Sequence, residues 1–143
     1  HQADLYFTVT TTPEKAVWKK ALINAGINPI ASIMNITNGE IIKNSYLKSL
    51  QEKILIEGAL TAEYAGVKID EEEIIKKTID VCIKTSSNRC SMLQDITNKH
   101  KTEIDYINGK IIKYAYKAGI KVPFNESLYY IIKAIESSFH DSL

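Results

Sequence analysis

Glycine is scarce in this chain, and its glycines are never close together. The 143 residues contain six of them, and no G-x-G pattern occurs: Gly26, Gly39, Gly58, Gly66, Gly109 and Gly119. A phosphate-cradling loop at the start of a nucleotide-binding domain needs closely spaced glycines, so that the backbone can approach a pyrophosphate group. These 143 residues therefore contain no dinucleotide-binding fingerprint.

Cysteine and long apolar runs are also in short supply. Cys82 and Cys90 form no C-x-x-C pair and have no histidine at a metal-ligand spacing, which favours two idle or buried cytosolic thiols. Asn24, Asn28 and Asn35 interrupt the longest apolar stretch, whereas a membrane span needs about 18 or more apolar residues. We expect no membrane segment and no signal peptide, and the cytoplasm as the location.

Charge of neither sign is in excess. Eighteen Lys and Arg against 17 Asp and Glu give a net charge of +1, and the lysines are spread along the chain. This balance offers no electrostatic case for a nucleic-acid partner. The length and the 45% hydrophobic content suit one domain with a real core. The chain opens at His1 without an initiator methionine, which indicates an excised fragment or a tag remnant.

Most of the sequence predicts helices. Thr12 and Pro13 are a cap and a first helical residue, and Pro29 should kink or end that helix near Asn28. Further helices are expected at about 44–65, from Asp70, at 92–98, at 102–118 and after Pro123. The segment LYFTVT, residues 5–10, is the one strand, and it has no partner strand in this chain.

Three polar residues stand at intervals of four in the otherwise apolar first helix. Lys20, Asn24 and Asn28 should line one helix face, with Ser32 and, in the turn that follows, Asn38 extending the polar track. An ammonium followed by two carboxamides is a row of hydrogen-bond donors, which predicts a wall that holds a small polar ligand, with Lys20 as a proton donor. Taken singly, each asparagine is more typical of a helix contact and the lysine of solvent exposure. Spacing alone leaves both interpretations open.

Polar groups recur in two other places. Ser91 stands at a helix start, where it is either an anion contact or an ordinary N-cap. Glu103 and Asp105 are expected in a first helical turn, where acids usually offset the helix dipole. His100 and His140 have no partner at a useful spacing and are expected on the surface.

Three sequence blocks carry a family resemblance. WKKALINAGINP followed by NG, then SMLQDI, then TEIDYING, resemble in order and separation the C-terminal domain of ketopantoate reductase (2-dehydropantoate 2-reductase). The match spans essentially the whole chain. It implies an all-α fold like that domain and the 6-phosphogluconate dehydrogenase C-terminal domain-like group. Residues 12–143 would then form the helical substrate-binding and catalytic domain. Residues 1–11, with the strand, would be the tail of a missing Rossmann nucleotide-binding domain.

The resemblance also implies roles for individual residues. Lys20 matches the catalytic lysine that protonates the ketone oxygen, and Glu103 the acid beside the cofactor and substrate hydroxyls. The substrate-binding positions are Asn24, Asn28, Asn38 and Ser91. Cys90 stands where many relatives have serine, and Lys99-His100 near a position that is often arginine; both departures concern ligand contacts of that loop.

The implied activity is NADPH-dependent reduction of 2-dehydropantoate to pantoate, in pantothenate and coenzyme A biosynthesis. NADPH would be bound mainly by the missing domain, so NADH stays an open choice, and the isolated chain should be inactive. A homodimer is a further partner that we leave open. The alternatives are a reductase of another 2-keto acid and, in a different class, a non-catalytic helical dimerisation module.

Overall fold

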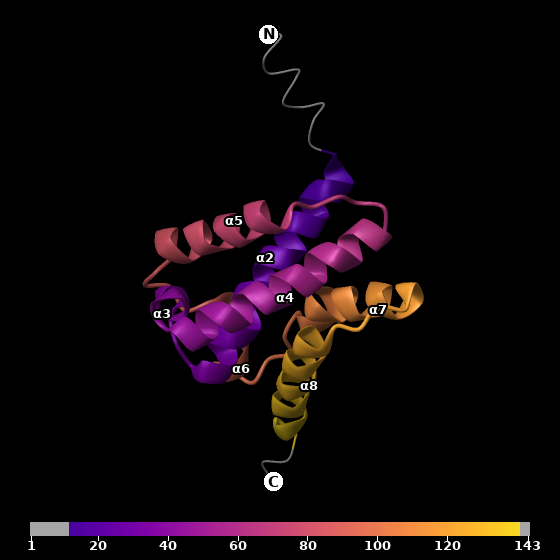
Figure 1. The fold of residues 1–143 in the computed structure, drawn as a ribbon. Helices are drawn as coiled ribbons and strands as arrows, with labels where there is room; N and C mark the ends of the chain where they lie inside the picture. The colour runs from indigo at the N-terminus through magenta and orange to yellow at the C-terminus, as the bar shows by residue number, and fades with distance from the viewer. Residues whose placement is uncertain (1–11, 141–143) are drawn as a thin grey trace.

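The structure is a computed structural model that describes residues 12–140. Every α-helix and 3₁₀-helix in that range is part of one all-α arrangement without strands, as predicted (Figure 1). The expected strand at 5–10 and the expected domain tail 1–11 lie outside the described residues. The elements are α2 (Pro13–Met34), α3 (Asn38–Lys43), α4 (Ser45–Tyr64), α5 (Glu71–Lys84), α6 (Ser91–Thr97), η1 (Ile104–Tyr106), α7 (Asn108–Ala118) and α8 (Pro123–Ser138).

Helix α2 is the centre of the fold. It packs against each of the other described α-helices, and its most extensive contact is with α4, which passes across it in Figure 1. The Thr12 hydroxyl accepts a hydrogen bond from the Lys15 N–H, and Asn35 ends the helix in the left-handed conformation. Its large buried side chains include Leu22 and Ile30. Because α2 is surrounded, its polar face can reach solvent only where no neighbouring helix covers it.

Of the two outcomes expected at Pro29, a kink or the end of the helix near Asn28, the second does not occur. The helix continues to Met34. Proline has no N–H to donate to the Ala25 carbonyl oxygen four residues earlier, but the buried Asn108 side chain places its Nδ2 3.5 Å from that oxygen. The next carbonyl, that of Gly26, accepts from Gln51 Nε2 at 2.9 Å. Neighbouring helices thus supply donors where the helix is weakest.

Asn108 belongs to a buried amide network. Its Nδ2 also donates to Asn125 Oδ1 at 3.0 Å, and Asn125 Nδ2 donates in turn to the Ile54 carbonyl oxygen and to Glu57 Oε1. Asn108 and Asn125 are both fully buried. Four helices, α2, α4, α7 and α8, are therefore joined through hydrogen bonds inside an otherwise apolar core.

Two more expectations are wrong in detail. The helix predicted at 102–118 is instead the short η1, a break at Ile107 and then α7. Thr102 does not begin a helix, since its hydroxyl and N–H are both bound to Glu136 of α8. Asn38, expected in a turn, is the first residue of α3, which a capping box of Thr37 and Glu40 starts.

Between residues 12 and 140, no helix combines the length and the apolar character that crossing a bilayer would require.

The role of Asn108 can be tested in a double-mutant cycle. Asn108→Ala leaves the Ala25 and Asn125 oxygens buried without this donor, so we expect it to lower the free energy of unfolding by about 1–3 kcal/mol. Pro29→Ala restores an N–H that can bond to the Ala25 oxygen, so the cost of Asn108→Ala should shrink in that background. Urea denaturation of the four proteins measures both costs. Equal costs in the two backgrounds would show that Asn108 does not serve that carbonyl.

Candidate functional site

Lys20 and Asn24 lie in one hollow on the surface of α2. The hollow has a volume of about 320 Å³ and its lining also includes Lys77 of α5. Lys20 is exposed and Asn24 half-buried. Lys19 on the same helix is paired with Glu73 at 2.9 Å. Lys19 lines the hollow as well. Within residues 12–140, neither Lys20 nor Lys77 has a hydrogen bond or an ion pair, so the hollow is lined by two ammonium groups without a directly bonded carboxylate.

Asn28 and Ser32 continue this helix face toward α6. The Cys90 thiol lies 3.7 Å from the Asn28 carbonyl oxygen and 3.6 Å from the Ser32 hydroxyl. Cys90, and not Ser91, is the N-cap of α6, and it accepts from the Leu93 N–H. Ser91 is therefore the first helical residue, with an exposed side chain. The contact through Cys90 brings Ser91 into the neighbourhood of half-buried Asn28, whereas Ser32 is buried in packing.

Asn38 is buried beneath the loop that follows α5. Its Nδ2 donates to Thr85 Oγ1 at 3.0 Å, and its N–H donates to the Asn88 carbonyl oxygen. Its Oδ1 is buried and has no hydrogen-bond partner among residues 12–140. Asn38 does not line the hollow that holds Lys20 and Asn24. Its visible role is to join α3 to the end of α5, and substrate binding by Asn38 stays a prediction.

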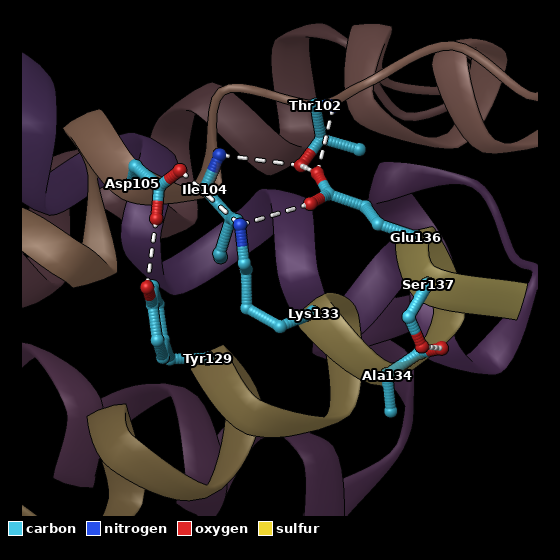
Figure 2. A network of polar contacts seen from close by, with 8 residues as sticks. All are labelled: Thr102, Ile104, Asp105, Tyr129, Lys133, Ala134, Glu136 and Ser137. Atoms are coloured by element: carbon cyan, nitrogen blue, oxygen red, sulfur yellow. Dashed lines mark hydrogen bonds and ion pairs between the residues drawn. The ribbon is translucent and has the colours of Figure 1, made fainter.

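The two acids of the TEIDYING block have different surroundings. The Glu103 side chain is exposed, and no hydrogen bond or ion pair to its carboxylate is found among residues 12–140. Asp105 accepts from the Tyr129 hydroxyl at 2.7 Å and pairs with Lys133 at 3.3 Å. Figure 2 shows Lys133 between the carboxylates of Asp105 and Glu136. Asp105 is thus a structural contact to α8, while Glu103 is free to meet a ligand.

The ionisable groups of this network stabilise one another's charged forms. The Tyr129 hydrogen bond, followed by Lys133, holds the pKa of Asp105 below its ordinary value despite partial burial. Burial alone would raise the pKa of Glu136, but hydrogen bonds from Thr102 and then Lys133 outweigh it and leave the pKa lowered. Lys133 responds in the opposite sense: burial acts to lower its pKa, and the two carboxylates leave it raised.

Sequence reasoning missed two parts of this arrangement. Lys77 looked like ordinary helix charge, and nothing in its local spacing reveals that α5 places it beside Lys20. Glu136 did leave a signal, because it follows Leu128 and Ile132 at intervals of four on the buried face of α8. An acid in such a stripe needs a partner, and here the partners are Thr102 and Lys133.

No group of three or more His, Cys, Asp or Glu side chains that could hold a metal ion is found between residues 12 and 140. Cys82 and Cys90 are both free and buried, as expected, and burial raises the pKa of the Cys82 thiol. His100 and His140 are exposed.

The comparison with protein families decides the relationship. The family model described as "Ketopantoate reductase PanE/ApbA C terminal" matches residues 14–136. The chain belongs to this family. A 2-dehydropantoate 2-reductase from Pyrococcus horikoshii is 41% identical over 122 residues, covering 84% of this chain and 40% of the relative. Another, from Archaeoglobus fulgidus, is 34% identical over 124 residues, covering 87% and 41%. These ketopantoate reductases confirm the resemblance read from the three sequence blocks.

Solved structures share the fold. A ternary structure of D-mandelate dehydrogenase with NADH and anilino(oxo)acetate matches with a TM-score of 0.83 at 29% identity, covering 88% of this chain and 53% of that one. A PanE/ApbA family ketopantoate reductase from Ralstonia eutropha matches with a TM-score of 0.82 at 24% identity, covering 87% and 42%; this second likeness concerns the fold alone. The chain spans about two fifths of the length of the first curated relatives it matches.

The charged network should make stability depend on pH in the acid range. The lowered pKa values of Glu136 and Asp105 mean that their contribution is present above the unfolded-state values, about pH 4, and is lost as the pH falls through the folded-state values. The difference in unfolding free energy between wild type and Glu136→Gln should therefore be largest at neutral pH and shrink below about pH 4. Denaturation at several pH values measures it. Ser137→Ala is the control, and a Glu136→Gln difference as independent of pH as this control's would contradict the coupling.

Proposed function

We propose that this chain is the substrate-binding and proton-donating part of a ketopantoate reductase, which reduces 2-dehydropantoate to pantoate. The observation that carries the proposal is the hollow on α2, where Lys20 and Asn24 lie together beside a second cation, Lys77. The nicotinamide cofactor, which we propose to be NADPH, would be held mainly by a nucleotide-binding domain joined to this chain. Pantothenate and coenzyme A biosynthesis in the cytoplasm would be the setting.

The residue types of the hollow suit a 2-keto acid. The substrate is an anion, and the ammonium groups of Lys20 and Lys77, which have no ion pair among the described residues, make the hollow attractive to a carboxylate. The Asn24 amide can hydrogen-bond to the substrate's oxygens without adding a competing charge. Asn28, one turn further along α2, and Ser91, the first residue of the neighbouring α6, would complete the substrate contacts.

Lys20 would act as the general acid. The bound cofactor supplies a hydride to the keto carbon, and negative charge then develops on the carbonyl oxygen. An ammonium group beside that oxygen lowers the energy of the charged transition state and donates the proton that completes the alcohol. Lys20 is the cation that suits this role, because Lys19 on the same helix is already paired with Glu73.

Glu103 fits a contact with the cofactor or with a substrate hydroxyl. Its carboxylate is exposed and accepts no hydrogen bond from the described residues. A carboxylate accepts hydrogen bonds from hydroxyl groups well, and it repels phosphate. We therefore assign it to hydroxyl groups.

A reductase of another 2-keto acid is the second candidate. The likeness to D-mandelate dehydrogenase, solved with anilino(oxo)acetate, favours including aryl-substituted 2-keto acids among the substrates to be tested. A purely structural dimerisation module is less consistent with two unpaired lysines facing one hollow. A homodimer remains compatible with the enzyme, and a structurally similar ketopantoate reductase from Staphylococcus aureus is described as dimeric.

The test uses a full-length protein that joins this chain to its nucleotide-binding domain. Lys20→Ala should lower kcat by about 10²–10⁴-fold, since the ammonium matters most as charge develops. Asn24→Ala should raise KM for 2-dehydropantoate as well, because a ground-state contact is lost. Lys76→Ala, an exposed α5 position that does not line the hollow, is the matched control. Turnover of Lys20→Ala within twofold to threefold of wild type would rule out the acid role.

The isolated 143-residue chain should not reduce 2-dehydropantoate. Hydride transfer needs the nicotinamide ring held against the keto carbon, and this chain has no glycine-rich fingerprint with which to hold the cofactor. Spectrophotometry of NADPH and NADH with the purified chain measures the rate, and the full-length protein at the same concentration is the positive control. Substrate-dependent oxidation of NADPH or NADH by the chain alone would contradict the proposal that a separate domain is needed to bind the cofactor.

A further inference from the structure

The turn that carries Glu103 is attached to α8 on both sides of that residue. Thr102 precedes Glu103 and is bound to Glu136, whereas Asp105 follows it and is bound to Tyr129 and Lys133 (Figure 2). The Glu103 side chain itself forms no hydrogen bond or ion pair with another residue in the part of the chain that the structure describes. The position of its carboxylate therefore depends on the backbone of the turn.

The attachment before Glu103 is buried. Glu136 is 8% exposed and Thr102 is 4% exposed. A single carboxylate oxygen of Glu136, Oε2, accepts from both the Thr102 N–H at 2.8 Å and the Thr102 hydroxyl at 2.5 Å. The same hydroxyl oxygen accepts from the Ile104 N–H at 3.3 Å, on the far side of Glu103. Hydrogen bonds to a charged carboxylate are short and strong, so they limit the movement of the Thr102 backbone, which donates one of them.

The attachment after Glu103 shares a cation with the first one. Lys133 Nζ lies 3.3 Å from Asp105 Oδ2 and 3.3 Å from Glu136 Oε1. Tyr129 adds a hydrogen bond of 2.7 Å to the other Asp105 oxygen. Lys133 is therefore occupied by two carboxylates, and Glu103 has no ion pair with it. The network fixes the turn and leaves the Glu103 carboxylate available.

We infer that Tyr129, Lys133 and Glu136 are positioning residues for Glu103, which they aim at a hydroxyl of the cofactor or substrate by holding the 102–105 turn against α8. The inference rests on the proposed function, because it gives Glu103 a ligand to meet. It differs from a general role in stability, since its effect on catalysis must pass through Glu103. A displacement of about 1 Å at such a contact can cost up to about 10²-fold in rate.

A double-mutant cycle in the full-length reductase separates the two roles. Glu136→Leu keeps the size of the side chain and removes both acceptors, so we expect kcat/KM to fall roughly tenfold to hundredfold. In a Glu103→Gln background the same change should cost less than about twofold, because the contact to be positioned is already lost. Tyr129→Phe should show the same pattern with a smaller loss. Ser137→Ala, whose hydroxyl bonds only within α8 to the Ala134 carbonyl oxygen, should leave kcat/KM unchanged in both backgrounds.

Thermal unfolding is measured on the same proteins. Glu136→Leu should lower the Tm by the same amount in both backgrounds, because Glu103 takes no part in the network. An equal loss of kcat/KM in the two backgrounds would overturn the inference and leave Glu136 a purely structural residue. A Glu136→Leu protein that keeps the wild-type kcat/KM would also overturn the inference.

A second measurement does not depend on catalysis. In the 143-residue chain, Glu136→Leu should speed amide hydrogen exchange at Thr102 and Ile104 at least tenfold more than at amides of α4, whereas Ser137→Ala should not. Unchanged relative exchange at these two amides would refute the attachment even if the reductase assignment is right. Faster exchange together with a full-length protein that reduces no 2-keto acid would uphold the attachment and remove the function proposed for Glu103.

Discussion

The continuity of α2 through Pro29 is the constraint on which the site depends. Proline leaves the Ala25 carbonyl oxygen without its helical donor, and the proposed substrate-binding residues, Asn24 and Asn28, precede and follow Ala25 in the same helix. Asn108 and Gln51 supply donors to the Ala25 and Gly26 oxygens from neighbouring helices. The helix can therefore keep its 3.6-residue period past the proline, which is what keeps its polar side chains on one face.

Local signals explain why much of the site could be predicted from sequence. Lys20, Asn24 and Asn28 depend only on helical spacing, and a helix over this stretch is favoured by Thr12 and Pro13 at its start. The order of the three sequence blocks was enough for the family. Local rules did not show that the helix continues past Pro29, because the donor to the Ala25 oxygen comes from Asn108, about 80 residues later. The same reason explains the broken helix at 102–118, where Thr102 is bound by Glu136.

Tertiary placement decides which polar residues face a ligand. Lys19, Lys20 and Lys77 all line the hollow, yet only Lys19 of these three forms an ion pair among the described residues, with Glu73. Asn38 and Ser32 belong to the same polar track by spacing, but both are buried in packing contacts. Sequence spacing identifies the polar residues that share a helix face. Ion pairing and burial then determine which of these side chains are available to a ligand.

Helix α8 links the two halves of the candidate site. Asn125, Tyr129 and Lys133 follow one another at intervals of four, so they share a face: the first reaches α2 through Asn108, and the other two reach Asp105. The stripe of Leu128, Ile132 and Glu136 beside it enters the core and ends at Thr102. One helix without a residue in the Lys20 hollow thus supports both the lysine-bearing helix and the turn that carries Glu103. The distance between Lys20 and Glu103, the residues proposed as proton donor and ligand-binding acid, consequently depends on the packing of α8.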